Sequence, residues 1–419
     1  MLRLRLGFGL FLAVAAVAAA ANLSPLATKP DWKTLEQYQE TITHDDFVRL
    51  LQNVYATRGY DDLIRVGNDD AKIVTDREKN ATFTLRFAKE KPRKPPRYWH
   101  FIQTLRPVRT DKPLGHLRIA LDPGHLGGKW AKMEERWYQI GESKPVEEGE
   151  MTLLVAQLLA KRLRELGAEV SFVRSKNAPV TPKRPDDLRV VARAVLKKNG
   201  VENPIDEYVA GDEATKPNSL QWQSELLFYR QSEIRYRARK VNADLRPDLV
   251  ICLHFNAEPW GDPKSPTLTD LTHFHMLVNG SYLPDEIALD DQRFEMLRKL
   301  LSRAFDEELP LADKMSGVFA QQTGLPPYQY TTDTVTKVGT SGYVYARNLL
   351  ATRLYRCPVV YFEPYVMNSN EVFARVQAGD YDGTRDLNGV QRPSIFREYA
   401  KAVADGLEEY CRSVRKARD

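Results

Sequence analysis

The chain has 419 residues, of which 42% are hydrophobic and 28% are charged, a composition that fits a globular protein and excludes a collagen, a coiled coil or a wholly disordered chain. Its formal net charge is +5, and no basic run in the sequence is interleaved with aromatic residues, so nucleic acid is not an expected partner. The three cysteines, Cys252, Cys357 and Cys411, are too few for a disulfide framework and are expected to be buried thiols.

The first residues have the pattern of a secretory signal peptide. Arg3 and Arg5 precede an apolar run over 7–20, and small residues at 19–21 provide a cleavage site before Asn22. The run is shorter than the about 20 apolar residues that cross a bilayer, so we expect no stable membrane span, with retention as an anchor as the alternative. Cleavage after residue 21 would leave a net charge of +3 and a secreted or periplasmic protein.

Residues 22–112 are predicted to form a small α+β accessory module and a linker. Helical spacing runs over 31–55, two strand-like pieces follow at 71–74 and 81–87, and a basic, proline-rich stretch occupies 89–97. A binding role and a purely structural role both remain open for this module.

Strands alternate with helices over 113–419, which predicts a second, larger domain. The expected elements are a strand at 117–121, a helix at 152–166, a strand at 168–173, helices at 186–198 and 218–243, strands at 248–253 and 273–278, helices at 291–308 and 346–354, a strand at 358–362 and a helix at 394–415. This order predicts an α/β, three-layer fold with a twisted, mostly parallel central sheet flanked by helices.

Polar side chains follow three of these strands. His125 comes shortly after the first strand, His254 ends the strand at 248–253, and Glu363 directly follows the strand at 358–362. Ligands of open α/β sheets bind beyond the carboxyl ends of the strands. A carboxylate after an apolar strand is costly to bury unless it is paired or bound to a metal. The three residues are therefore expected to converge on one site.

Two histidines at strand ends suggest a divalent metal. Catalytic zinc usually has three protein ligands and one open position for water, so a third ligand is needed. The acidic residues Glu147, Glu148 and Glu150, just before the helix at 152–166, are the candidates. The alternative is that these glutamates only favour a helix N-terminus and that the histidines are ordinary surface or core residues.

Three motifs in this order resemble the zinc-dependent N-acetylmuramoyl-L-alanine amidases of the cell-wall hydrolase type. The motifs are Leu121-Asp122-Pro123-Gly124-His125 with Gly127-Gly128, then His254-Phe255-Asn256-Ala257, then a buried strand that ends in Glu363. The resemblance covers roughly 115–410. It implies a twisted sheet flanked by helices, one Zn²⁺ ion held by two histidines and a glutamate, and a second glutamate that acts in catalysis.

Carried over to this chain, the resemblance assigns the metal to His125, His254 and Glu148, the last because it lies four residues before Thr152. Glu363 matches the catalytic glutamate. Asp122 and Asn256 are expected to orient ligands or substrate. The chain departs from the family at Cys252, where serine is usual, and in the long segment of 23 residues from His125 to Glu148.

The expected reaction is hydrolysis of the amide bond between N-acetylmuramic acid and L-alanine of peptidoglycan, by a metal-activated water with a glutamate base. Peptidoglycan is the expected partner, and a protein activator is a further candidate partner. Two alternatives stay open: another zinc amide hydrolase, such as a carboxypeptidase, and a catalytically inactive protein that binds or regulates the cell wall.

Overall fold

A mixed sheet of seven strands, in the order β11-β12-β10-β13-β9-β5-β8, lies at the centre of the computed structural model, which describes residues 22–209 and 211–418. The expected signal peptide at 1–21 lies outside the described residues. Four neighbouring strands, β8, β5, β9 and β13, run parallel, whereas β10 and β12 run in the opposite direction and β11 is antiparallel to β12. The bounds are β5 (Arg118–Pro123), β8 (Glu169–Phe172), β9 (Leu249–Leu253), β10 (Phe274–Val278), β11 (Thr336–Lys337), β12 (Val344–Ala346) and β13 (Val359–Pro364).

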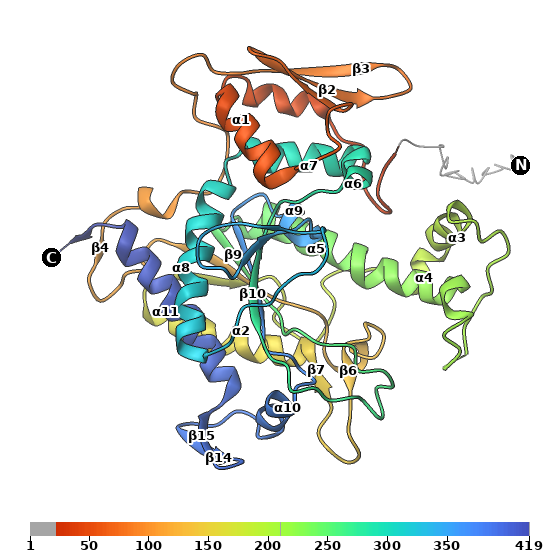
Figure 1. Ribbon diagram of the computed structural model, residues 1–419, viewed down its shortest axis with the longest axis vertical. Helices are drawn as coiled ribbons and strands as arrows, with labels where there is room; N and C mark the ends of the chain where they lie inside the picture. Colours follow the sequence, from red (N-terminus) through yellow and green to blue (C-terminus); the bar gives the residue numbers. More distant parts are fainter. Residues whose placement is uncertain (1–21, 210, 419) are drawn as a thin grey trace, which may run out of the picture.

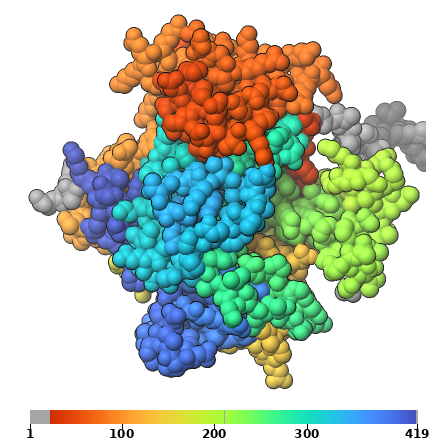
Figure 2. All heavy atoms as spheres, viewed as in Figure 1, coloured from red at the N-terminus to blue at the C-terminus, as the bar shows by residue number. Residues whose placement is uncertain are grey.

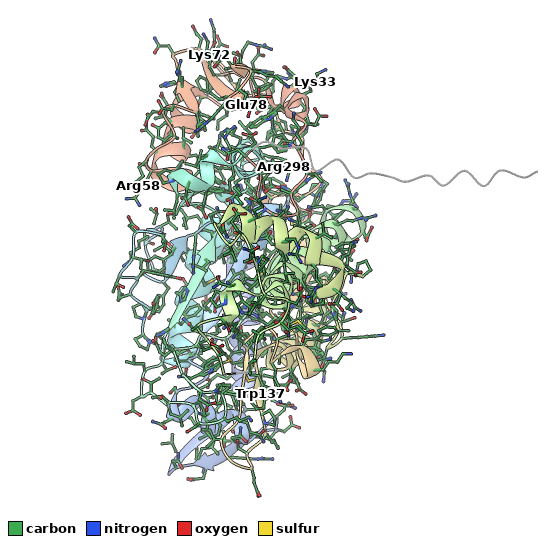
Figure 3. All side chains as sticks on the ribbon, turned by 90° about the vertical axis from the view of Figure 1, so that its right-hand side faces the viewer. Lys33, Arg58, Lys72, Glu78, Trp137 and Arg298 are labelled. Atoms are coloured by element: carbon green, nitrogen blue, oxygen red, sulfur yellow. The ribbon has the colours of Figure 1, made fainter. Side chains whose placement is uncertain are left out.

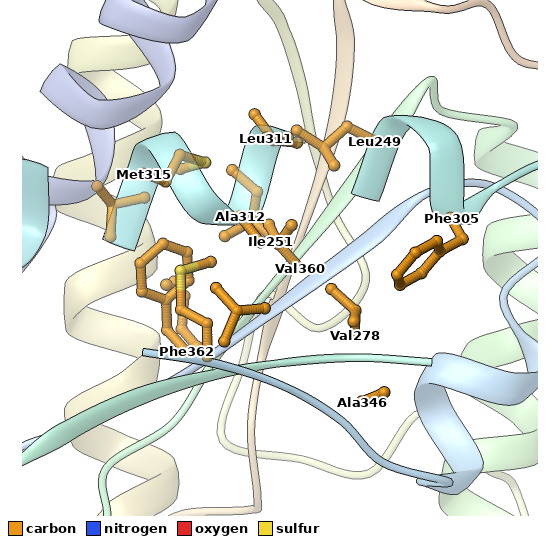
Figure 4. Close-up of a cluster of buried hydrophobic side chains, with 14 of the residues drawn as sticks. Leu249, Ile251, Val278, Phe305, Leu311, Ala312, Met315, Ala346, Val360 and Phe362 are labelled. Atoms are coloured by element: carbon orange, nitrogen blue, oxygen red, sulfur yellow. The ribbon is translucent and has the colours of Figure 1, made fainter. Parts of the chain in front are cut away.

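Helices cover both faces of this sheet (Figure 1). One face packs against α2 (Glu148–Glu165), α8 (Phe305–Thr323) and α11 (Ile395–Val414), and the other against α5 (Glu233–Arg239) and α9 (Leu350–Leu354). Figure 4 shows the first of these interfaces, where Ala312 and Met315 of α8 lie near Ile251 and Phe362 of the sheet. Burial on both faces explains why the central strands read as continuous apolar runs, and the predicted three-layer, mostly parallel fold is confirmed.

Several of the predicted helices differ in detail, and the one expected at 346–354 begins only at Leu350, because 344–346 form β12. The helix expected at 291–308 is two helices, α7 (Asp290–Leu301) and α8, separated where Arg303 takes a left-handed conformation with φ of 62°. The second of these continues to Thr323 and contains Pro310. The residues that follow the proline keep an apolar stripe against the sheet, and this burial outweighs the preference of proline for a helix end.

The helix expected at 218–243 is present but carries π-type turns. It comprises α4 (Leu220–Leu226), η7 (Leu227–Ser232), α5 and η8 (Lys240–Leu245). Together with α3 (Arg189–Lys198), α4 forms a lobe that projects from the body and has its own small apolar cluster (Figures 1 and 2).

The N-terminal module lies at one end of the molecule, above α6 (Pro284–Ala288) and α7 (Figure 1). Its expected helix at 31–55 is interrupted, and its elements are η1 (Trp32–Tyr38), α1 (His44–Leu50), η2 (Leu51–Tyr55) and the antiparallel sheet β1 (Ile64–Val66), β2 (Asp70–Asp76) and β3 (Ala81–Arg86). Aromatic contacts join module and body: the rings of Trp32 and Phe294 lie 5.3 Å apart, and those of Tyr55 and Phe305 lie 6.4 Å apart. The domain boundary near residue 112 stays a prediction.

Shorter elements complete the described chain. They are η3 (Ile102–Thr104), β4 (Val108–Arg109), η4 (Gly128–Trp130), β6 (Trp137–Tyr138), β7 (Val146–Glu147), η5 (Pro185–Leu188), η6 (Lys216–Asn218), α10 (Asn370–Gln377), β14 (Thr384–Leu387), β15 (Val390–Pro393) and β16 (Ala417–Arg418). Within the described ranges, no helix has both the length and the apolar character needed to cross a membrane.

Candidate active site

The carboxyl ends of β5 and β9 and the first turn of α2 bring three candidate metal ligands together. His125 follows β5, His254 follows β9, and Glu148 is the first residue of α2. One donor atom from each of the three lies within 4.8 Å of the other two. Two imidazole nitrogens and one carboxylate oxygen at this spacing are a donor set that suits Zn²⁺.

The Glu148 carboxylate lies between the two imidazole rings. Its Oε1 is 3.1 Å from Nδ1 of His254 and its Oε2 is 3.3 Å from Nε2 of His125. The backbone N–H of Phe255 also donates to Oε1, at 3.1 Å. The rival glutamates lie elsewhere: Glu147 accepts the backbone N–H of Gly128 at 2.6 Å, and Glu150 is exposed.

His125 is fixed through its backbone and its ring. The residue has a φ of 53°, a left-handed conformation that is costly for a residue with a side chain and is often kept at functional sites. Its Nδ1 lies 3.1 Å from Oε2 of Glu134, and the same oxygen accepts the N–H of Leu126 at 2.9 Å. Glu134 therefore holds the ring so that Nε2 faces Glu148, as carboxylates commonly do behind a metal-bound histidine.

His254 is held by an aromatic stack and by a glycine. Its ring lies parallel to that of Tyr361, with the centroids 4.2 Å apart, and its carbonyl accepts the hydroxyl of Tyr399 at 3.1 Å. A Cβ on Gly124 would lie 2.1 Å from Cε1 of His254. Only glycine at position 124 therefore leaves room for the ring.

Asp122 contacts neither histidine ring and instead anchors a buried arginine. Nη1 of Arg237 donates to Oδ1 of Asp122 at 2.9 Å and to the carbonyl of Pro123 at 2.8 Å. The same guanidinium reaches the carbonyl of His125 at 3.3 Å and pairs with Glu233 at 2.9 Å. This network fixes the turn that carries His125, so Asp122 acts on the site only indirectly, through Arg237.

Asn256 supports the loop after β9. Its Oδ1 accepts the N–H of Ala257 at 2.7 Å, and its side-chain nitrogen lies 3.5 Å from Nδ1 of His273. His275, two residues further along β10, is buried, and its Nε2 lies 2.9 Å from the hydroxyl of Tyr330. Neither His273 nor His275 belongs to the group of three metal-ligand candidates.

Glu363 lies near the carboxyl end of β13, the strand that pairs with β9, and the charge of Glu148 acts on it. It is directly opposite His275 in the pairing of β13 with β10, and it is partly buried. Burial raises the pKa of its carboxyl well above the usual range, and the negative charge of Glu148 acts in the same direction, whereas Arg136 and Arg347 oppose the rise. Such a carboxyl takes up a proton at a higher pH than an ordinary glutamate does.

The electrostatics of the ligands suit cation binding. Burial lowers the pKa of His125 well below its usual value, and the charge of Arg136 adds to this effect, so the imidazole is neutral, as a metal ligand must be. Burial alone would raise the pKa of Glu148, but His125, His254 and Arg136 lower it to a net value below its usual range. Glu148 is therefore a carboxylate.

Glu134 and Arg136 were not anticipated from the sequence. Both lie in the long segment between His125 and α2, and Nε of Arg136 is 3.2 Å from Oε2 of Glu148 and 3.4 Å from Nε2 of His125. Burial raises the pKa of Glu134 to about 7. The only signal in the sequence was a Glu-Glu-Arg run, which is common on exposed surfaces.

The residues 257–340, which lie between His254 and Glu363, mostly belong to the body. They supply β10, a strand inside the central sheet, and α8, which packs on that sheet, whereas α7 packs against α9, η1 and η2. The loop 324–327 joins α8 to a short bridge between Pro327 and Phe274.

Neither a protein-family profile nor a curated protein matches the sequence. Solved structures with a similar arrangement include the N-acetylmuramyl-L-alanine amidase Ami1 of Mycobacterium smegmatis, at 16% identity over 72% of this chain and 99% of that chain, with a TM-score of 0.38. The amidase AmiC2 of Nostoc punctiforme has 14% identity over 71% of this chain and 98% of that chain, with a TM-score of 0.36. The CwlD amidase of Clostridioides difficile, in complex with the GerS lipoprotein, has 10% identity over 70% of this chain and 98% of that chain, also with a TM-score of 0.36. Likeness at this level does not establish the family or the chemistry of the chain.

Proposed function

We propose that this protein is a zinc-dependent N-acetylmuramoyl-L-alanine amidase that acts on peptidoglycan outside the cytoplasm. The observation that carries the proposal is the convergence of His125, Glu148 and His254, whose donor atoms lie within 4.8 Å of one another. Glu148 and His254 are 106 residues apart in the chain, so this meeting is a product of the fold. The three motifs that resemble the amidase family supply the choice of bond.

The residues present fit a resident zinc ion. Nε2 of His125, a carboxylate oxygen of Glu148 and a ring nitrogen of His254 would hold it, with Glu134 behind His125. Zinc in a site with three protein ligands supplies a Lewis acid that lowers the pKa of a bound water and polarises a carbonyl. Asp122 and Asn256 support the ligand loops, the first through Arg237 and the second through Ala257.

Glu363 is the proposed general base. Its carboxylate accepts a proton from the attacking water and returns the proton to the amide nitrogen of L-alanine as the bond to the lactyl carbonyl breaks. The raised pKa of Glu363 favours both halves of this exchange, because the group can hold the proton between the two steps. Arg136 forms an ion pair with Glu148, and its positive charge also lowers the pKa of Glu363. It therefore offsets part of the repulsion between the two carboxylates.

Digestion of purified peptidoglycan tests this proposal. The mature protein with zinc is expected to release free stem peptides that begin with L-alanine and to leave intact glycan strands, as read by mass spectrometry of the products. Treatment with a chelator and dialysis should abolish release, and added Zn²⁺ should restore it.

Three other results would contradict the proposal. Release of single C-terminal amino acids would identify a carboxypeptidase. Turnover that is indifferent to chelation would rule out the metal, and binding to peptidoglycan without any turnover would identify a binding or regulatory protein. A His254→Ala variant that is folded but lacks bound zinc serves as the control for the metal.

A further inference from the structure

A second site lies at the opposite edge of the central sheet. His254 and Glu363 are at the carboxyl ends of β9 and β13, whereas Arg246 and Arg356 precede the amino ends of the same two strands. These arginines line a cavity of about 330 Å³ between the N-terminal module, the linker and the body. Figure 3 shows Arg298, which also lines this cavity, at the level where the module meets the body.

The cavity concentrates positive charge. Arg97, Arg246, Arg298, Arg356 and Lys299 line it, and no aspartate or glutamate is among its lining residues. The charge of Lys299 is balanced by an ion pair outside the cavity lining, because its Nζ lies 2.7 Å from Oε1 of the buried Glu308. The four guanidinium groups remain without a balancing acid in the wall.

Aromatic rings pack against three of these arginines, Arg97, Arg246 and Arg298, and the guanidinium of Arg298 lies 5.5 Å from the ring of Phe294. The guanidinium of Arg97 lies 4.6 Å from the ring of Trp99 and donates to the carbonyl of Ser302 at 3.2 Å. The guanidinium of Arg246 lies 4.8 Å from the ring of Tyr98. Stacking fixes an arginine through its face and leaves its N–H groups free to donate.

Arg298 and Arg356 have N–H groups available for a ligand. Within the described part of the chain, the guanidinium groups of Arg298 and Arg356 make no hydrogen bond or ion pair. The nearby Glu295 pairs instead with Arg353, at 2.9 Å. Burial lowers the pKa of Arg298 to about 10, and the positive charge of Arg356 acts in the same direction. The charge of Glu295 acts in the opposite direction, but the net pKa of Arg298 stays below its usual value.

We propose that this cavity, the arginine pocket, binds the phosphate or pyrophosphate group of an anionic ligand. Guanidinium groups match phosphate oxygens in bidentate geometry and hold them by charge-assisted hydrogen bonds. Tyr38 and Tyr98 line the same cavity and provide side walls for the part of the ligand next to the phosphate. Because Thr34 and Tyr38 belong to the N-terminal module, the proposal gives that module a share in ligand binding.

Isothermal titration of the mature protein with inorganic pyrophosphate tests the proposal. We expect saturable binding that weakens with added salt and becomes at least about tenfold weaker in R298Q/R356Q, since two charge-assisted contacts are lost. The matched control is R65Q, because Arg65 is exposed on β1 away from the pocket. Circular dichroism checks folding, and R356Q alone, at an exposed position, serves if the double variant fails to fold.

A second variant separates this pocket from the proposed metal site. His254→Ala should bind pyrophosphate as the wild type does, so loss of the amidase activity and loss of pyrophosphate binding are independent outcomes. Vesicles of phosphatidylcholine with and without phosphatidic acid distinguish the sources of the phosphate: binding that R298Q/R356Q abolishes assigns a lipid headgroup, and no vesicle binding assigns a soluble or polymeric phosphate. Equal affinity of wild type and R298Q/R356Q, or equal weakening in R65Q, would overturn the proposal.

Discussion

His125 is constrained at its backbone, at Nδ1 and at Nε2, and each constraint involves a different part of the chain. Its carbonyl accepts from Arg237, its Nδ1 faces Glu134 and its Nε2 faces Glu148. The contact with Glu134 can be altered with the least change of side-chain shape, because glutamine has nearly the same shape as glutamate. It therefore provides a direct test of how much the orientation of the ring contributes to metal affinity.

Glu134→Gln is expected to weaken zinc binding by roughly 10- to 100-fold, because an amide replaces the carboxylate that orients the imidazole. Competition with a chromophoric chelator measures this affinity. Glu150→Gln is the matched control, since Glu150 is exposed and only two residues from Glu148. A Glu150→Gln variant that lost more affinity than Glu134→Gln would reverse the assignment of the third ligand.

Glu363→Gln should keep bound zinc and lose activity by roughly 100- to 10,000-fold, the usual contribution of a general base. In the wild type, the proposed base can accept a proton only when it is deprotonated. Activity is therefore expected to fall as pH falls through the pKa of Glu363, at a higher pH than an ordinary glutamate would give, because burial raises this pKa. The profile of kcat/KM against pH measures the midpoint. Full activity of Glu363→Gln would exclude the role.

At the scale of single residues, the sequence predicted which ligand candidates lie together but not the contacts that fix their side chains. His125 and His254 were predictable because each follows an apolar strand, and strand ends of a parallel sheet converge. Glu134 and Tyr361 were not, because their contacts depend on the path of a long loop and on the rotamer of His254. Such contacts leave no periodic signal in a single sequence.

The start of α2 is the element on which the site depends most. Glu148 is its first residue, and a Cβ on the next residue, Gly149, would lie 2.2 Å from the carbonyl carbon of Leu126. The contact is between two backbones, so a flexible side chain cannot relieve it. The close approach is what brings Glu148 to the loop that carries His125.

Gly149→Ala is expected to lower the free energy of unfolding by about 1–3 kcal/mol through overpacking and to reduce zinc affinity as Glu148 moves away. Gly317→Ala is the matched control, because Gly317 also lies in a helix, α8, but a Cβ there would meet no atom within 4 Å. The control should be neutral or more stable by up to about 1 kcal/mol, as alanine favours a helix. Chemical denaturation measures both, and equal effects would contradict the close approach.

Element boundaries were predicted less well than element types. The sequence predicted the end of a helix near Pro310 because proline removes a backbone donor, yet α8 continues to Thr323. Leu311, Met315 and Phe319 are buried beneath α11 and against the sheet, and this tertiary burial decides the outcome. Propensity alone carries no information about such packing.

At the scale of the whole molecule, Asp248 joins the linker to the central sheet. Its side chain is 1% exposed and accepts from Arg118 twice, at 2.7 Å and 3.0 Å. It also accepts the backbone N–H of His100 at 3.0 Å. The residue lies directly before β9, so it fixes the path from the N-terminal part into the body.

Asp248→Asn is expected to cost about 2 kcal/mol at neutral pH, because buried hydrogen bonds to a charge are lost. Burial would raise the pKa of Asp248, but Arg118 and His100 lower it. Its contribution to stability is therefore present above about pH 4, the unfolded value, and is lost as pH falls through the folded pKa. Thermal unfolding of wild type and variant from neutral to acid pH should show curves that converge, and a constant difference would contradict this.

The order of strands in the central sheet also determines when the site can form. β9 pairs with β5 on one side and β13 on the other, although about 130 residues separate β9 from β5 in the chain. Contacts so distant in sequence close late and slowly during folding, because loop-closure entropy must be overcome first. His125 and Glu148 precede β9 in the chain, and His254 joins them only when β9 has docked beside β5. The proposed metal site is thus complete only after this long-range pairing, and a chain trapped before that step would be compact but would lack one of the three proposed ligands.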